Sequence, residues 1–209
     1  MPFWHSIDPL FGNGLCVGAV GRSPAGPLPV GAAGADFEAG VRALRDQNYT
    51  AALHEFQSLA AAGVANAEFM VGVMYENGYG AEANSEVAAN WYRRAAERGL
   101  ASAQYNLSVF YQLGKGVAFN LSEAVKLSRL AADKGHAAAQ TNLGVYYLVG
   151  EGIDRDLVES WKWLSIASRT LDGVALNTVR TNLVQVEKQL NAADLADEKR
   201  RAEVWQPVK

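Results

Sequence analysis

The chain has 209 residues, of which 49% are hydrophobic, and its 19 basic and 22 acidic residues give a formal net charge of -3. This mild imbalance, without blocks of like charge, argues against a general nucleic-acid or acidic-membrane partner. A single cysteine, Cys16, excludes an intrachain disulfide, and no stretch of 18 or more apolar residues could span a bilayer.

The first 35 residues differ in composition from the rest of the chain. They carry five of the six prolines but only one basic and one acidic residue, Arg22 and Asp8. One interpretation is a disordered arm. The other is an export leader cleaved near Ala35, which would make the protein periplasmic or secreted rather than cytoplasmic. The small residues before Ala35 resemble the end of a signal peptide, but the apolar stretch from Leu10 to Val20 is interrupted and has no Lys or Arg before it, so such a leader is atypical.

Beyond residue 35, three glycine pairs recur with a spacing of 36 residues. A tyrosine three residues before each pair, and an alanine eight residues before that tyrosine, keep the same phase. A period in this range predicts a stack of repeated helical units, which offers a continuous surface to partners and rarely builds a catalytic cleft. The pairs are Gly78 and Gly80, Gly114 and Gly116, and Gly150 and Gly152.

We therefore predict an all-α fold, a right-handed solenoid of antiparallel helix pairs with about ten helices. A looser leading unit covers residues 36–63, and three regular units cover 64–99, 100–135 and 136–171. Residues 172–209 are expected to form C-terminal capping helices, the last beginning after Asn191 and burying Leu195, Ala202 and Trp205.

Fixed positions inside each unit predict how its two helices end, begin and pack. The first glycine of each pair should end the first helix in the left-handed conformation. Gly72 and Gly144, with Ser108 at the same phase, predict a close approach of the two helices of a unit. The second helices should be capped by Asn84, Asn120 and Asp156, with Glu123 and Glu159 placed for a reciprocal capping bond.

The middle unit carries the motif most fully, in Ala103-Gln104-Tyr105-Asn106-Leu107, Gly114-Lys115-Gly116-Val117 and Ala131-Ala132-Asp133-Lys134-Gly135. These residues resemble the Sel-one-like repeat, a branch of the tetratricopeptide-like helical repeats, and the resemblance runs from residue 36 to about 171. It implies a non-enzymatic adaptor of bacterial type that binds a protein or peptide partner. The segment from Arg180 to Trp205 also resembles the C-terminal cap of bacterial members, many of which are exported.

In helical-repeat solenoids the first helix of each unit lines the concave face, and partners bind there. If this holds here, nine residues off the buried stripe face the groove, and their lack of charge suits a peptide or helix docked by apolar anchors. The alternative is that the same side chains pack between neighbouring first helices. The residues are Phe69, Val73, Asn77, Tyr105, Val109, Leu113, Thr141, Val145 and Val149.

The alternative function is a cell-wall-related enzyme that binds or hydrolyses β-lactams, because some members of the resembled family are linked to that chemistry. It needs a serine with a lysine three residues on, and no serine of this chain has one. The glycine pairs lack the features of a phosphate loop, since Lys115 is followed by glycine. We expect no catalytic residue, metal site or cofactor.

Histidine and tryptophan are the remaining candidates for ligand sites. The histidines have no metal-ligand spacing, and His54 and His136 are expected at the surface of a helix or loop. Trp163 shares its phase with Trp91 and should be core. Trp161 is out of phase and is the candidate for an exposed ligand platform.

Overall fold

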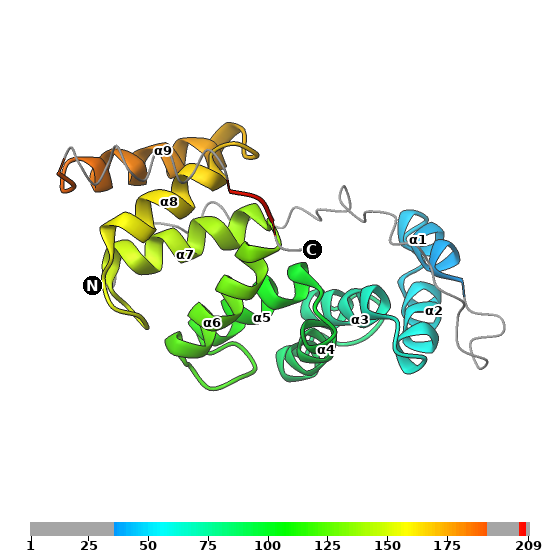
Figure 1. Ribbon diagram of the computed structural model, residues 1–209. Coiled ribbons are helices and arrows are strands. Elements are labelled where there is room, and N and C mark those ends of the chain that lie inside the picture. Colours follow the sequence, from blue (N-terminus) through cyan, green and yellow to red (C-terminus); the bar gives the residue numbers. More distant parts are fainter. Residues whose placement is uncertain (1–35, 192–204, 208–209) are drawn as a thin grey trace.

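The computed structural model describes residues 36–191 and 205–207, and all regular structure within them is helical (Figure 1). The expected leader and the expected last helix after Asn191 lie outside these residues, which contain nine helices. In chain order they are α1 (Phe37–Arg45), α2 (Tyr49–Ala61), α3 (Ala65–Asn77), α4 (Ser85–Glu97), α5 (Ala101–Leu113), α6 (Leu121–Asp133), α7 (Ala137–Val149), α8 (Leu157–Ala167) and α9 (Gly173–Glu187).

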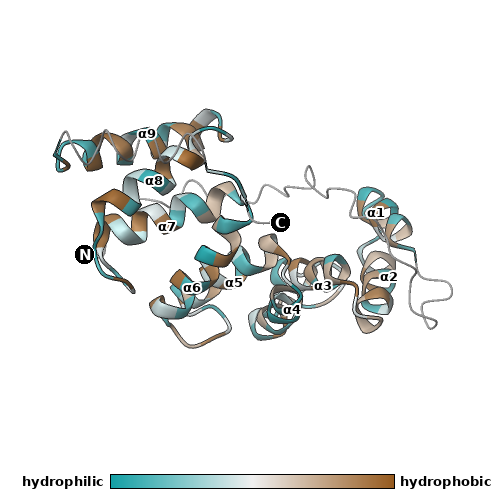
Figure 2. Ribbon diagram, in the orientation of Figure 1, coloured by the Kyte–Doolittle hydropathy of each residue, from teal (hydrophilic) through white to brown (hydrophobic). Residues whose placement is uncertain are grey.

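Each helix packs against the next in the chain, so the molecule is an all-α solenoid of helix pairs closed by α9, which lies on α8 (Figure 1). The described helices show both hydrophobic and hydrophilic residues, as amphipathic helices do (Figure 2). The buried side chains form three clusters, each of which joins the second helix of one pair to the first helix of the next: α2 with α3, α4 with α5, and α6 with α7, the last cluster extending over α8 to α9. Tyr75 packs against the first and second clusters and Tyr111 against the second and third, so partly buried side chains link the clusters along the array.

The glycine pairs are the turns between the two helices of a pair. Gly78, Gly114 and Gly150 end α3, α5 and α7 in the left-handed conformation, with φ of 73°, 66° and 80°. The second glycine of each pair also has positive φ, and a Cβ added there would overlap the backbone at the start of the preceding unit's second helix. Only glycine combines this conformation with this approach. The backbone atoms approached belong to Tyr49, Ser85 and Leu121.

The predicted caps are confirmed. The side-chain oxygens of Asn84, Asn120 and Asp156 accept hydrogen bonds from backbone N–H groups in the first turns of α4, α6 and α8. The prediction of a reciprocal capping bond is wrong. Glu123 accepts from Lys126, and Glu159 accepts from Lys162 and from the Trp163 indole, because these donors lie one helical turn further on.

The close approach at Gly144 is confirmed. A Cβ there would lie 2.7 Å from Leu164 Cγ and 3.2 Å from the carbonyl oxygen of Ser160, and the Ser160 hydroxyl donates to the Gly144 carbonyl at 2.7 Å. Gly72 faces the ring of Tyr92 in the same way. Helices within a unit thus meet closely at a position where a side chain has little room.

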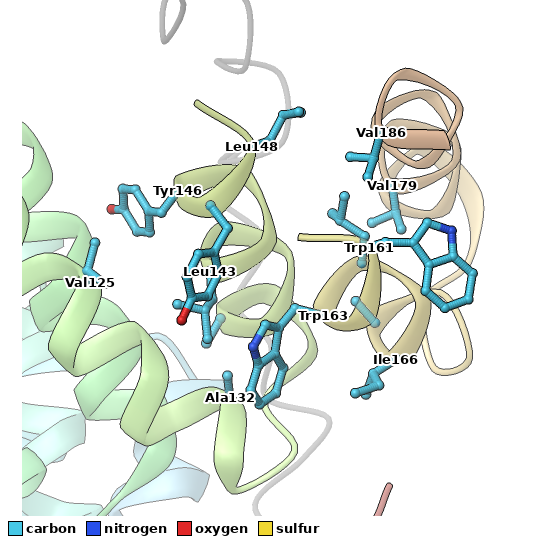
Figure 3. Packing of buried hydrophobic residues seen from close by; sticks show 14 of the residues in the cluster. Val125, Ala132, Leu143, Tyr146, Leu148, Trp161, Trp163, Ile166, Val179 and Val186 are labelled. Carbon is cyan, nitrogen blue, oxygen red and sulfur yellow. The ribbon is translucent and has the colours of Figure 1, made fainter. Parts of the chain in front are cut away.

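Trp161 is not an exposed platform. It is 5% exposed and belongs to the core, where it faces Val179 and Val186 of α9 (Figure 3). Its indole N–H donates to Glu187 at 2.9 Å. The same position of the repeat is buried in the other two units, as Ala89 and Val125, so it is a core position even though those residues are not aromatic.

His136 and Trp205 also differ from expectation. His136 is partly buried at the start of α7, where its Nδ1 accepts from the N–H of Ala139 at 3.3 Å and caps the helix. Burial lowers the pKa of His136 from 6.5 to about 4. Trp205 contacts the core as predicted, but residues 205–207 are not helical.

Candidate partner-binding surface

The nine predicted partner-binding residues lie on α3, α5 and α7, in three rows that run across the repeats. The first row is near the helix starts, the second is in the middle and the third is at the helix ends, beside the glycine turns. The rows are Phe69, Tyr105 and Thr141; Val73, Val109 and Val145; and Asn77, Leu113 and Val149.

The first row is engaged in contacts within the array. The ring of Phe69 lies 5.6 Å from that of Tyr92, and Phe69 packs on the cluster shared by α4 and α5. Tyr105 stacks on His136, with 4.7 Å between ring centroids and an interplanar angle of 25°. Thr141 donates to the carbonyl of Ala137. The Phe69–Tyr92 pair lies within one unit and the Tyr105–His136 stack joins two units, so both rings of this row are engaged inside the array.

The second row is also largely covered. Val73 packs on the cluster of α4 and α5, and Val145 is only 6% exposed. Val109 is partly buried. A partner would therefore reach little of this row.

The third row is the open one. Asn77 is exposed and its side-chain amide donates to the carbonyl of Val73, which keeps it on its own helix. Leu113 is 64% exposed, and Val149 is partly buried. Of the nine residues, Leu113 therefore offers the largest apolar side chain to solvent.

Phe119 is a further exposed residue at the α5–α6 turn and is not among the nine predicted residues. It is 65% exposed, and its Cβ lies 3.5 Å from where a Cβ on Gly114 would stand. Phe119 and Leu113 thus flank one glycine at the α5–α6 turn. The equivalent positions in the other units hold Ala83 and Arg155. This break in the repeat pattern was the signal that could have found it.

An ion pair from the preceding unit fixes the α5–α6 turn. The Lys115 ammonium binds the Glu76 carboxylate of α3 at 2.8 Å, and the Tyr92 hydroxyl donates to the other oxygen of Glu76 at 2.5 Å. Burial, followed by the neighbouring charge of Glu76, raises the pKa of Tyr92. The hydroxyl therefore stays protonated and holds Glu76. Exposed apolar side chains on a fixed turn can bury surface against a partner without first ordering the turn.

Within ranges 36–191 and 205–207, there is no group of three or more His, Cys, Asp and Glu side chains placed to hold a metal ion. In the same part of the chain, no helix combines the length and apolar character needed to cross a bilayer.

The fold and this surface define a helical-repeat protein of the tetratricopeptide-like class. A family model for the Sel1 repeat matches residues 65–100, 101–136 and 137–169, and the chain belongs to this family. Proteins built from Sel1 repeats generally mediate protein–protein interactions, and the fold is typically a non-enzymatic scaffold. No curated protein matches.

Two solved structures are similar to the chain. The crystal structure of a Sel1 repeat protein from Oxalobacter formigenes is 32% identical with a TM-score of 0.65, over 69% of this chain and 59% of that one. A protective antigen present in uropathogenic Escherichia coli strains, with the Sel1-like repeat fold, is 31% identical with a TM-score of 0.64. That match covers 73% of this chain and 32% of the antigen. The chain thus spans less than two thirds of either protein.

Proposed function

We propose that this protein is a non-catalytic scaffold that binds a peptide or protein partner on the first-helix face of its repeats, with Leu113 and Phe119 as the apolar anchors. The observation that carries the proposal is the exposure of these two side chains at one fixed turn, while the other two rows of the face are engaged inside the array. The third-row neighbours Asn77 and Val149 would border the partner.

The mechanism is burial of apolar surface. Removing a leucine or phenylalanine side chain from water contributes about 1.5 to 3 kcal/mol. Two such anchors can therefore provide much of the affinity for a short segment, since the turn that carries them is already held by Glu76 and Lys115. The face is nearly uncharged, which favours a partner segment with apolar anchors of its own.

Replacing both anchors tests the proposal. We expect L113A/F119A in the full chain to lose at least tenfold in the recovery of any protein that the wild type captures from the native host. The matched control is Val174→Ala, which removes an exposed apolar side chain of α9 and should leave capture unchanged. Circular dichroism should show equal helicity for all three proteins. Equal recovery by L113A/F119A and the wild type would contradict the proposal.

The other predicted residues give a second comparison. Tyr105→Ala removes the ring that stacks on His136, so we expect it to lower the melting temperature as well as partner capture. Leu113→Ala should lower capture alone, because Leu113 is exposed. A loss of helicity in Leu113→Ala would place that residue in the core instead.

The proposed setting is the periplasm or the exterior of a bacterial cell. The small residues before Ala35 support it, as does the resemblance of the chain to exported repeat proteins. Mass spectrometry of the protein from its native host should find a mature N-terminus near Asp36. An intact N-terminus at Met1 would overturn this setting and leave the binding proposal untouched.

The β-lactam alternative has no residue to support it, since none of the serines is followed by lysine three residues later. We expect no turnover of a chromogenic β-lactam by the purified protein. Turnover that follows the protein through purification would contradict the non-catalytic assignment.

A further inference from the structure

The C-terminal residues Trp205–Pro207 lie against the last unit of the array (red in Figure 1). The Trp205 ring meets the Trp163 ring of α8 edge-on, with centroids 5.9 Å apart and an interplanar angle of 73°. Pro207 approaches Gly135, and its Cγ lies 3.2 Å from where a Cβ on that glycine would stand. We call the surface formed by Trp163 and Gly135 the C-terminal seat.

The seat occupies a repeated position of the fold. Gly63, Gly99 and Gly135 follow α2, α4 and α6 at the same phase, with φ of 83°, 85° and 85°. A basic side chain from the following unit covers the first two glycines: Arg98 covers Gly63 and Lys134 covers Gly99. At Gly135 the equivalent residue of the next unit is Thr170, and the proline of the chain's own end takes this place.

Trp163 is held in position without the C-terminal residues. Its indole N–H donates to Glu159 at 2.9 Å, and the Lys162 ammonium lies 4.9 Å from the ring centroid. Lys162 in turn binds Glu159 at 2.8 Å. The aromatic surface of the seat is therefore formed by α8 itself, and a preformed surface binds a ligand at a lower entropic cost.

The present occupant covers the Trp163 ring, which is 2% exposed, but it keeps exposed surface of its own. Trp205 is partly buried, whereas Gln206 and Pro207 are exposed. The contacts that define the seat are an edge-on ring pair and a proline lying over a glycine. Contacts of this kind can be made equally well by another segment with the same two side chains.

We propose that the C-terminal seat is a second peptide-binding subsite, which takes an aromatic residue followed two positions later by proline, and that Trp205 and Pro207 occupy it in cis as an exchangeable occupant. A partner with this pattern gains access by displacing residues 205–207, so this segment regulates binding. The proposal rests on the scaffold function in general but involves neither Leu113 nor Phe119.

The test uses the full chain and a labelled peptide of residues 201–209, with the sequence RAEVWQPVK. A tethered segment competes at an effective concentration of the order of millimolar. If the peptide binds the open seat with a Kd near 0.1 mM, the wild type should bind it about tenfold more weakly than W205A/P207A does. Fluorescence anisotropy measures both values. The same peptide with both tryptophan and proline changed to alanine should bind neither protein.

A second, milder variant tests the proposal even if W205A/P207A fails to fold. Pro207→Ala changes one exposed side chain, so its helicity should equal that of the wild type, and its affinity for the peptide should lie between those of the wild type and W205A/P207A. Equal affinity of all three proteins for the peptide, or no binding by either variant at millimolar peptide, would overturn the proposal. A wild-type dimer that W205A/P207A fails to form would support the seat and identify a second copy as its occupant.

The experiments can contradict either binding proposal without contradicting the other. L113A/F119A should bind the peptide like the wild type, because its seat is unchanged. If W205A/P207A does not bind the peptide while L113A/F119A still loses its captured partner, the proposed subsite at the C-terminal seat is wrong and the proposed function stands. If W205A/P207A binds the peptide and L113A/F119A captures its partner as the wild type does, the proposed subsite stands and Leu113 and Phe119 are not the anchors.

Discussion

The first regular unit, α3–α4, and the middle unit, α5–α6, solve one problem in two ways. In each, a backbone carbonyl at the end of the preceding helix accepts a hydrogen bond from a side chain of the unit. In the first unit this donor is held by Glu68 of the first helix, which is fully buried. It accepts from Arg94 and Arg98, and Arg94 also donates to the carbonyl of Ala60 at 3.2 Å.

In the middle unit the equivalent residue is Gln104, and its own amide donates to the carbonyl of Ala96 at 3.2 Å. Leu130 stands where the first unit has Arg94. The Gln104 side-chain oxygen consequently has no hydrogen-bond partner among the described residues. Gln140 of the last unit repeats the amide bond, to the carbonyl of Ala132 at 3.1 Å.

The difference teaches that the fold repeats the backbone acceptor, and the side chains adapt to it. The carbonyls of Ala60 and Ala96 each accept a backbone N–H, from Gly63 and Gly99, and each takes the side-chain donor on its second lone pair. A glutamine supplies the donor directly. A glutamate cannot, so that unit adds an arginine which satisfies both the carboxylate and the carbonyl.

Breaking the interaction between Glu68 and Arg94 should have the largest effect on stability. Arg94→Leu leaves Glu68 with Arg98 as its one cation and removes the side-chain donor of the Ala60 carbonyl, so we expect a loss of about 3 kcal/mol in the free energy of unfolding. The double variant E68Q/R94L recreates the middle unit and should recover more than half of that loss. Urea unfolding measures the wild type, Arg94→Leu, Glu68→Gln and E68Q/R94L. If Arg94→Leu lowers the free energy of unfolding as much in the Glu68→Gln background as in the wild type, residues 68 and 94 do not act together in the way proposed.

The start of α7 gives the next largest effect, because His136 caps its helix while Val64 and Leu100 at the same phase do not. Burial places the folded-state pKa of about 4 below the ordinary 6.5, so the unfolded chain binds the proton more readily. The stabilisation is complete above pH 6.5 and is lost as the pH falls toward 4, by about 3 kcal/mol in all.

Melting temperatures of the wild type and of His136→Asn between pH 7 and pH 4 check this expectation. Asparagine retains an acceptor for the cap but does not titrate in this range. The variant should therefore lose less stability over the interval than the wild type. Parallel curves would show that His136 does not contribute to the pH dependence.

The helix contact within each unit comes next. Gly144→Ala places a methyl group against Leu164 and the Ser160 carbonyl, so we expect a loss of about 1 to 3 kcal/mol through overpacking. The middle unit already accommodates a Cβ at this phase, where Ser108 and Ser128 join hydroxyls at 3.1 Å. Ser108→Ala keeps that Cβ and should cost less. An unchanged melting temperature for Gly144→Ala would remove the close-packing explanation.

The smallest expected effect is a gain in stability. Leu130→Arg puts the donor of the first unit beside the unpartnered oxygen of Gln104 and removes an exposed leucine, so we expect stabilisation by about 0.5 to 1 kcal/mol. Leu130→Ala removes the same apolar surface without adding a donor and serves as the control. Thermal melting should rank the arginine variant above the alanine variant, and the opposite order would count against the pairing.

The candidate site was predictable only in part. Phase along the repeat placed the nine residues on α3, α5 and α7, since phase fixes the face of a helix. It did not distinguish Leu113, which is exposed, from Val145, which is buried. That distinction depends on how much of each first helix the next unit covers, and a repeat period does not contain this information.

The sequence by itself determined the repeat, its glycine turns and its caps, because positive φ and capping bonds are local requirements that a few residue types meet. Only the tertiary structure decided which tryptophan the terminal helix buries, how Glu68 is paired and what lies over Gly135. Each of these contacts joins residues from different helices or from the chain end. They depend on the path of the whole array, which the spacing of 36 residues does not specify.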